Sequence, residues 1–207
     1  MIKEACVENF IEAKKAQIAG AERIELCENL AQGGTTPSYG TVKKVIEKIK
    51  VPVFVMIRPR GGDFCYSSSE IDIMIEDIRL FKKLGVKGVV LGVLTKDNKI
   101  DYSILKDILK ETNGMEVTFH KAIDVVSNPT DEIEKLIKLG IDRILTSGGG
   151  KTALEGKEIL NKMIAISSRR ITIVVAGGVT LENLEEIRSQ IPSTEFHGKK
   201  IVGDLNK

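Results

Sequence analysis

The sequence predicts an α/β fold of the (β/α)8 TIM-barrel class, organised as a single domain over residues 1–207. Eight short β-like runs alternate with seven helical stretches, and this order indicates parallel strands joined by right-handed crossovers. Polar residues follow nearly every run, as they do at the carboxyl ends of barrel strands. An open doubly wound sheet is the alternative, but no Gly-x-Gly-x-x-Gly turn follows the first run.

The predicted strands are short apolar runs that end in turn-forming or polar residues. They are Ile2–Val7, Arg23–Cys27, Val53–Arg58, Gly88–Gly92, Glu116–His120, Arg143–Thr146, Thr172–Ala176 and Glu195–His197. The third run is the most distinctive, because hydrophobic sheet changes within one residue into the cationic, glycine-rich loop Arg58–Gly62.

Helical stretches separate these strands, and their ends carry start and stop signals. We expect them to begin near Asn9, Ser38, Ser69, Tyr102, Pro129, Thr152 and Thr180. Proline at position 129 suits a first helical turn, and Gly20, Gly85 and Gly140 stand where helices end before the next strand.

The chain is short for this fold, since a typical barrel has about 250 residues. Only ten residues, Gly198–Lys207, follow the last predicted strand. We therefore expect an incomplete outer helix ring after strand eight. We also expect a homo-oligomer in which a partner subunit covers that flank.

The composition argues against several function classes. Lysine and arginine number 31 against 29 acidic residues, and aromatic residues make up 4%, which disfavours a nucleic-acid partner. No apolar run reaches membrane-spanning length, and the first residues lack a signal-peptide pattern. Three cysteines without a Cys-x-x-Cys motif suit a reducing compartment. We expect a cytoplasmic protein that binds neither nucleic acid nor membrane.

Side-chain alternation along each strand predicts which residues face the barrel interior. Apolar positions such as Val55, Ile57 and Phe119 should pack on the helices. The inward set carries charges and thiols, and it comprises Glu4, Cys6, Glu25, Cys27, Phe54, Met56, Arg58, Thr118, His120, Glu195 and His197. Such a cluster is either a mutually satisfied ion-pair core or a site for a polar ligand. We favour the ligand site, because several of these residues run into glycine-rich loops.

One function for such a cavity is that of an enzyme acting on a small phosphorylated or carboxylated metabolite. His120, Glu25 and His197 are the candidate catalytic residues, as general acids or bases. Arg58 and Arg60 would clamp the anion. Further candidates to contact substrate are acidic residues of the cavity and loop residues whose backbone amides can hold an anion. They are Glu4, Asp124, Ser147, Gly148, Gly177 and Gly178. A catalytically inactive scaffold is a third possibility, which the charged cavity disfavours.

Several runs of the chain are unusual enough to indicate a family. They are Arg23–Cys27, Gly33–Pro37, Val53–Phe64, Val117–His120, Arg143–Gly148, Ala153–Gly156 and Glu195–His197. In these runs, which extend from its first strand to its eighth, the chain resembles the CutC family of copper-homeostasis proteins. The resemblance implies a cytoplasmic (β/α)8 barrel with a role in copper handling, and it supplies no settled reaction. The chain departs from the family in ending soon after strand eight and in having Cys65 where an apolar residue is expected.

The resemblance also implies a metal site, because the family's proposed copper-binding cysteines match Cys6 and Cys27. Cu(I) prefers thiolate ligands. Neighbouring strands lie about 4.8 Å apart, so two inward cysteines could share an ion if they stood at equal height, which the sequence does not give. Buried cysteine is also common as a small hydrophobe. A hard-metal site of Glu4, Glu25 and His197 stays open. The expected ligands are a small anion, Cu(I) or both, and no organic cofactor is indicated.

Overall fold

The computed structural model describes residues 1–205 and forms a closed barrel of eight parallel strands, in which each strand pairs with its neighbours in the chain. The strands are β1 (Ile2–Val7), β2 (Arg23–Leu26), β3 (Val53–Met56), β4 (Gly88–Leu91), β5 (Glu116–Phe119), β6 (Arg143–Thr146), β7 (Thr172–Val175) and β8 (Glu195–Gly198). The predicted fold class is confirmed. Several strands are shorter than predicted, so Cys27, Arg58 and His120 lie just beyond them, at the carboxyl end of the barrel.

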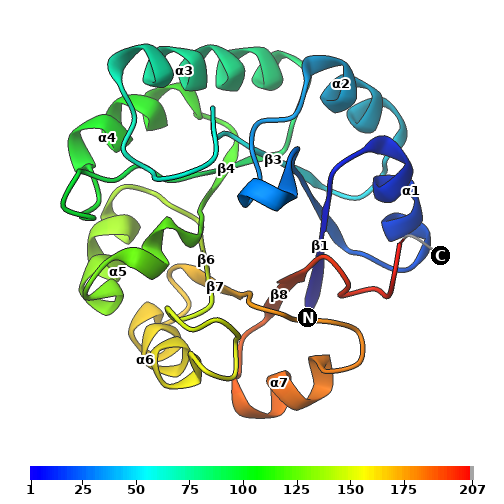
Figure 1. Cartoon of the computed structure of the whole chain (residues 1–207), viewed down its shortest axis with the longest axis vertical. Helices are drawn as coiled ribbons and strands as arrows, with labels where there is room; N and C mark the ends of the chain where they lie inside the picture. Colours follow the sequence, from blue (N-terminus) through cyan, green and yellow to red (C-terminus); the bar gives the residue numbers. More distant parts are fainter. Residues whose placement is uncertain (206–207) are drawn as a thin grey trace.

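The helices form a ring outside the barrel (Figure 1). They are α1 (Phe10–Ile18), α2 (Tyr39–Lys48), α3 (Ser68–Lys83), α4 (Tyr102–Glu111), α5 (Pro129–Lys138), α6 (Lys157–Ser167) and α7 (Leu184–Gln190), with short 3-10 turns η1 (Leu30–Gln32) and η2 (Lys121–Val125). Local chemistry explains their starts: Ser67 and Glu70 form a capping box at α3. Within residues 1–205, no helix combines the length and apolar character that crossing a membrane requires.

Two helices begin later than the sequence predicts. α6 starts at Lys157 instead of near Thr152, because the preceding loop folds back tightly on itself. A Cβ on Gly156 would lie 1.8 Å from the carbonyl oxygen of Ser147, so only glycine permits this approach. α7 starts at Leu184 instead of near Thr180, because Thr180 forms an isolated bridge with Lys200 of the C-terminal segment.

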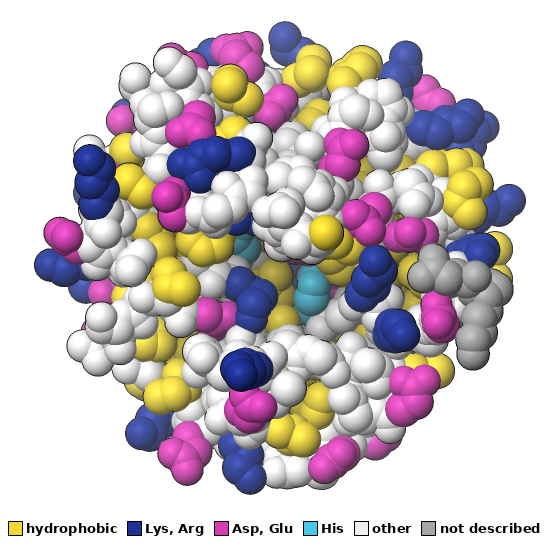
Figure 2. All heavy atoms as spheres, viewed as in Figure 1, with side chains coloured by type: hydrophobic (Ala, Val, Ile, Leu, Met, Phe, Trp, Pro, Cys, Tyr) yellow, Lys and Arg dark blue, Asp and Glu magenta, His cyan; other side chains and the backbone are white. Residues whose placement is uncertain are grey.

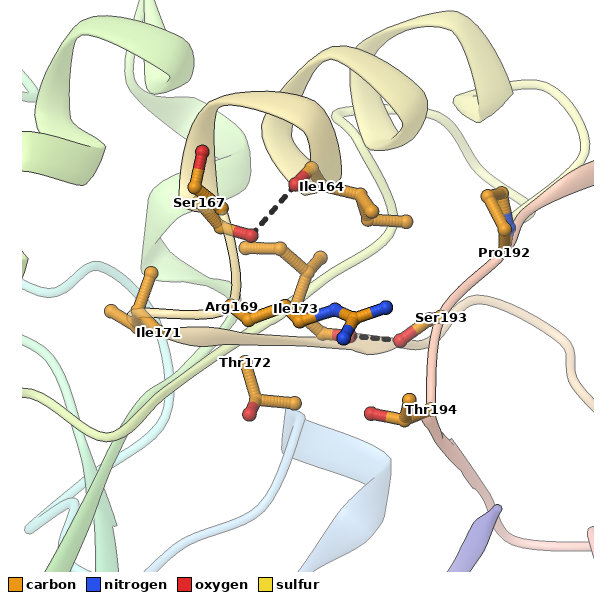
Figure 3. A pocket seen from close by; sticks show the side chains of 10 residues that line it. Ile164, Ser167, Arg169, Ile171, Thr172, Ile173, Pro192, Ser193 and Thr194 are labelled. Carbon is orange, nitrogen blue, oxygen red and sulfur yellow. Dashed lines mark hydrogen bonds between the residues drawn. The ribbon is translucent and has the colours of Figure 1, made fainter.

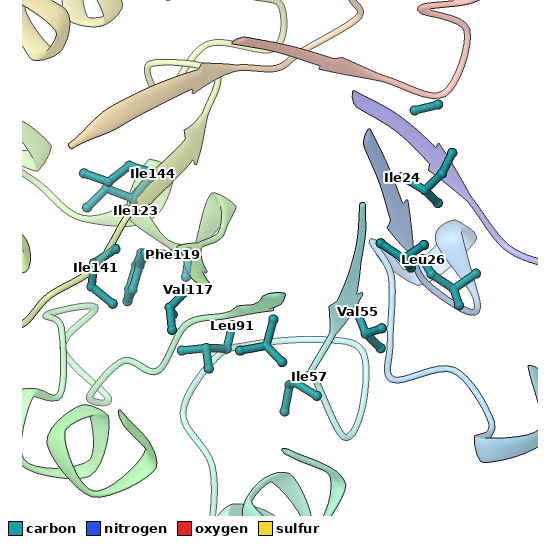
Figure 4. Packing of buried hydrophobic residues seen from close by; sticks show 14 of the residues in the cluster. Ile24, Leu26, Val55, Ile57, Leu91, Val117, Phe119, Ile123, Ile141 and Ile144 are labelled. Carbon is teal, nitrogen blue, oxygen red and sulfur yellow. The ribbon is translucent and has the colours of Figure 1, made fainter. Parts of the chain in front are cut away.

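The main hydrophobic core lies between the barrel and the helices. Ile24, Leu26, Val55, Ile57 and Phe119 belong to this layer, as their alternation predicts, and Figure 4 shows them projecting from the strands. The opposite positions form a separate inner cluster, which contains Cys6, Cys27, Phe54, Met56 and Val90. Alternation therefore separates an apolar layer under the helices from a barrel interior that contains the two thiols.

The described chain has seven helices, and its C-terminal segment takes the place of an eighth. Ile201, Val202 and Leu205 are buried in the main core. The carbonyl of Leu205 accepts a hydrogen bond from Lys15 Nζ at 2.8 Å, and Figure 1 shows the red segment beside α1. The predicted gap in the helix ring is confirmed, and this segment of the same chain covers it. The expectation that a partner subunit covers this flank is therefore wrong, whereas the homo-oligomer itself stays a prediction.

Candidate functional site

The amino end of the barrel interior holds a network of arginines and carboxylates. Arg23 pairs with both Glu4 and Glu195, and Arg143 pairs with Glu195 at 3.0 Å and with Glu116 at 2.5 Å. Glu195, which we expected in the ligand cavity, instead lies at this end because it is the first residue of β8, and two arginines pair with it there. Arg23 was missed, although it shares a strand face with Glu25. This level is therefore an ion-pair core.

Phe54 lies beside the ionic network. Both guanidinium groups approach its ring, with Arg23 Cζ at 4.9 Å and Arg143 Cζ at 5.1 Å from the centroid. Such contacts stabilise a cation against an aromatic face. The phenyl ring thus gives both arginines an additional partner within the barrel.

Two buried thiols meet nearer the carboxyl end. Cys6 Sγ lies 4.0 Å from Cys27 Sγ, and Glu25 Oε2 lies 3.1 Å from the first sulfur and 3.4 Å from the second. The two cysteines are not at equal height, since Cys6 pairs in register with Glu25 and Cys27 lies two residues further along the chain. Their side chains nevertheless converge, so a single ion could contact both sulfurs.

His197 links the thiols to the ionic network below them. Its Nδ1 lies 2.8 Å from Glu4 Oε1, and its Nε2 lies 3.6 Å from Glu25 Oε2. Two groups of metal-ligating atoms, each with its members within 4.8 Å of one another, follow from this arrangement. One is Cys6, Glu25 and Cys27, and the other is Glu4, Glu25 and His197. Glu25 belongs to both.

The electrostatics of this cluster favour one ionised thiol. The hydrogen bond with Cys27 lowers the pKa of Cys6 to about 5, and the same bond, with burial, raises the pKa of Cys27 well above its usual value. Burial and the neighbouring Cys6 charge raise the pKa of Glu25. Burial opposes a charge on His197, but its contacts with Glu25, Cys6 and Glu4 prevail and raise its pKa. Cys6 is thus the more acidic of the two thiols, and it lies near an imidazole whose pKa is raised.

A cavity of about 150 Å³ opens above the thiols. Its lining combines charged groups with apolar side chains, and comprises Cys6, Glu25, Leu30, Gly33, Met56, Arg58, Phe64, His120, Lys121, Leu145 and His197. Figure 2 shows histidine side chains in the hollow at the centre of the face where the strands end. Leu30, in the 3-10 turn η1, and Phe64, in the loop after β3, were missed because no periodic pattern marks an inward position there.

The structure brings only part of the predicted anion site to this cavity. Arg58 lines it, but two of its guanidinium nitrogens donate to the carbonyls of Gln32, Gly34 and Gly62. Arg60 does not line it, because its guanidinium pairs with loop and helix carboxylates, Asp63 at 3.0 Å and Glu70 at 2.5 Å. Arg58 therefore braces the loops of the cavity, and Arg60 braces the loop outside it.

The predicted glycine-rich anion loop is occupied by a side chain of the protein. The Asp124 carboxylate accepts from the backbone amide of Ser147 at 3.2 Å and from that of Gly149 at 3.1 Å. The Gly148 amide donates to Thr146 Oγ1 at 2.9 Å. Gly177 and Gly178 lie against the same loop and do not line the cavity.

A larger hollow of about 490 Å³ lies at the other end of the barrel, between the end of α6 and the starts of β7 and β8 (Figure 3). Its three serine hydroxyls donate to nearby backbone carbonyls, as Ser167 Oγ does to that of Ile164 at 2.7 Å. Arg169 is the one titratable residue in its lining. The smaller cavity, with its thiols and histidines, is therefore the functional candidate.

Known proteins share both the sequence and the fold of this chain. The family model described as "CutC family" matches residues 1–202. The "Copper homeostasis protein cutC homolog" of Homo sapiens is 44% identical over 95% of this chain and 72% of its own length. A CutC family protein of Enterococcus faecalis is 42% identical over 98% of this chain and its whole length. The solved CutC structure from Streptococcus agalactiae has a TM-score of 0.92 and 38% identity, covering 97% of this chain and 99% of that one. The chain belongs to the CutC family.

Proposed function

We propose that the protein handles copper by binding one Cu(I) ion between Cys6 and Cys27. The observation that carries the proposal is the 4.0 Å separation of two buried sulfurs, one on β1 and the other just beyond β2. With metal–sulfur bonds of about 2.3 Å, as for zinc thiolates, this separation corresponds to a sulfur–metal–sulfur angle of about 120°. That angle leaves room for a third ligand. Thiolates are also the donors that Cu(I) prefers.

Neighbouring groups suit this role. Glu25, which is within 3.4 Å of both sulfurs, could supply the third donor or accept a proton that a thiol releases. Cys6 lines the cavity, which gives an ion a route from the carboxyl end of the barrel. The human and mouse relatives are named as copper homeostasis proteins, which agrees with the proposal. We place this activity in the cytoplasm, where reducing conditions keep the thiols free.

A Cu(I) competition titration against a chromogenic chelator tests the copper role. We expect one ion per chain for the wild type, and loss of that binding in Cys6→Ala and in Cys27→Ala. Cys65→Ala is the matched control, because this third free cysteine does not belong to the cluster of Cys6, Glu25 and Cys27. Affinity should fall as the pH is lowered, since protons compete for the thiolates. Equal affinity in the wild type and both site variants would remove the thiols from the copper role.

An enzyme acting on a small carboxylated metabolite is a second candidate function. One observation favours it: the Nε2 atom of His120 is buried at the cavity and has no hydrogen-bond partner among the described residues. A positioned, neutral imidazole N–H of this kind can donate a hydrogen bond to negative charge that develops on a ligand oxygen. Consumption of a carboxylate by the wild type, and not by His120→Asn, would support this function. The glycine-loop amides that a phosphate would need are already bonded, so a phosphorylated substrate is less well supported.

A further inference from the structure

We propose that the 150 Å³ cavity binds a small organic carboxylate, whose oxygens accept hydrogen bonds from His120 Nε2 and Arg58 Nε. This ligand would bind beside the copper site without using its sulfurs. The inference does not depend on the copper proposal, because it rests on other atoms of the cavity.

The first observation is the tautomer of His120. The backbone N–H of Ala122 donates to His120 Nδ1 at 3.2 Å, so Nδ1 must carry the lone pair. Burial and the charge of Arg58 lower the pKa of this histidine to about 3, so the ring is neutral near pH 7. Its single proton is therefore on Nε2. That N–H is buried, lacks an acceptor in the described chain and belongs to a residue of the cavity lining.

The ring is held firmly in this orientation. Phe64 packs against it with centroids 4.9 Å apart. On another side, a Cβ on Gly92 would lie 2.6 Å from His120 Cε1, so the imidazole lies directly on the backbone there. With Nδ1 fixed by Ala122, the Nε2 donor has little freedom to find another acceptor.

The second observation is the Nε atom of Arg58. The terminal nitrogens of this guanidinium bond to three loop carbonyls, whereas Nε is buried without a partner in the described chain. Both of these groups are donors, and leaving such donors unsatisfied is costly. The third unpaired buried atom on a described lining residue is Glu25 Oε1, which lies on the side of the thiols. A ligand that satisfies them must bring acceptor oxygens, and a carboxylate offers two.

The charge and size of the cavity narrow the ligand further. Arg58 brings to the lining a buried guanidinium whose bonded partners are neutral carbonyls, which favours an anion. Cys6 and Glu25, the acidic groups of the lining, are matched by His197. The apolar part of the wall, formed by Leu30, Met56, Phe64 and Leu145, suits a short hydrocarbon body. A cavity of about 150 Å³ in another protein accommodates benzene, so a ligand of about six non-hydrogen atoms fits.

Butyrate, which has six non-hydrogen atoms, is the probe. Isothermal titration and thermal melts of the copper-free protein would measure its binding, with n-butylammonium and inorganic phosphate as comparison ligands. We expect saturable binding and a raised melting temperature with butyrate alone. Absence of butyrate binding, or equal binding of either comparison ligand, would overturn the carboxylate assignment.

A pair of variants tests the His120 donor. His120→Asn keeps an acceptor near the Nδ1 position for the Ala122 amide but lacks a group at Nε2, whereas His120→Gln can place an amide N–H near Nε2. We expect butyrate to bind His120→Asn at least tenfold more weakly, as loss of a hydrogen bond to a charged group predicts, and His120→Gln to recover part of the affinity. Unchanged affinity in His120→Asn would refute the role of this donor.

Two further measurements distinguish loss of the butyrate contact from misfolding of a variant and from loss of the copper site. In the wild type, the Nε2 proton resonance of His120 should move when butyrate binds, and an unmoved resonance would count against contact. Only two histidines are present, which simplifies the assignment. Cys27→Ala, which removes a proposed copper ligand outside the cavity lining, should bind butyrate as the wild type does. Loss of butyrate binding in that variant would contradict the independence of the two sites.

Discussion

Arg23 is the residue whose replacement should reveal how strongly the barrel depends on its buried ionic network. Its guanidinium holds the carboxylates of Glu4 and Glu195, and its side chain is 5% exposed. Arg23→Met would keep a long side chain but leave both carboxylates without this cation. Breaking a buried ion pair costs about 3–5 kcal/mol. Glu4 keeps His197 at 2.8 Å and Glu195 keeps Arg143 at 3.0 Å, so we expect a loss near 3 kcal/mol.

Urea unfolding followed by circular dichroism would measure this loss. With a dependence of about 2 kcal/mol per molar urea, the midpoint should fall by about 1.5 M. Arg79→Met is a matched control, because Arg79 also pairs with two carboxylates, Glu76 and Glu111, but its side chain is 47% exposed. Exposed pairs contribute about 1 kcal/mol or less, so this control should change the midpoint by 0.5 M or less, at about 2 kcal/mol per molar urea.

The pH dependence of the Arg23→Met effect provides a second check. Although burial works against it, contact with His197 and Arg23 lowers the folded-state pKa of Glu4 from 4.5 to about 2. A lowered carboxyl pKa stabilises the fold above pH 4.5, and that contribution is lost as the pH falls towards 2. The gap between wild type and variant should therefore narrow over this range. A loss under 1 kcal/mol, or one equal to that of Arg79→Met, would refute the reasoning.

Three other predictions concern stability. The folded-state pKa of His120 is lowered from 6.5 to about 3, so its neutral form stabilises the fold above pH 6.5 and this contribution is lost as the pH falls towards 3. Urea unfolding at several pH values should therefore show that the unfolding free energy of His120→Asn falls less steeply with decreasing pH than that of the wild type, by up to about 1.4 kcal/mol per pH unit. Gly156→Ala should lower the free energy of unfolding by about 1–3 kcal/mol, because the added methyl group presses on Ser147. Gly40→Ala, which has open space in α2, should raise it by up to about 1 kcal/mol. An equal change in melting temperature for the two variants would contradict this contrast. Ile201→Ala should cost about 2–5 kcal/mol in chemical unfolding if the C-terminal segment is part of the core, and a loss under 1 kcal/mol would show that it is not.

The sequence predicted the barrel and the faces of its strands well, because both depend on local periodicity. Alternation correctly placed Val55 and Ile57 outside and Phe54 and Met56 inside. It could not supply the height of a side chain along the barrel axis, which depends on strand register. For that reason Glu195 was expected at the cavity, although it begins its strand at the opposite end.

The loops were harder to predict, because their hydrogen bonds form between segments far apart in the chain. The glycine-rich run at Ser147 and Gly148 suggested an anion site, and its amides do bind anionic and polar groups. Those groups are the Asp124 carboxylate and Thr146 Oγ1, which belong to the protein. Likewise, the charge of Arg60 suggested a ligand clamp, but Asp63 and Glu70 already neutralise it. Residue type predicted the kind of contact in each case, and only the fold identifies the partner.

The two-residue offset between Cys6 and Cys27 has a consequence for oxidation. Strand spacing of about 4.8 Å and a rise of about 3.3 Å per residue place their Cα atoms roughly 8 Å apart. Disulfides usually need a Cα separation of about 4.4–6.8 Å, so this pair cannot close without moving backbone. The sulfurs can thus converge on an ion while resisting a bond to each other. After treatment with diamide, thiol titration of the unfolded protein should still find both cysteines reduced, and a Cys6–Cys27 disulfide would contradict this protection.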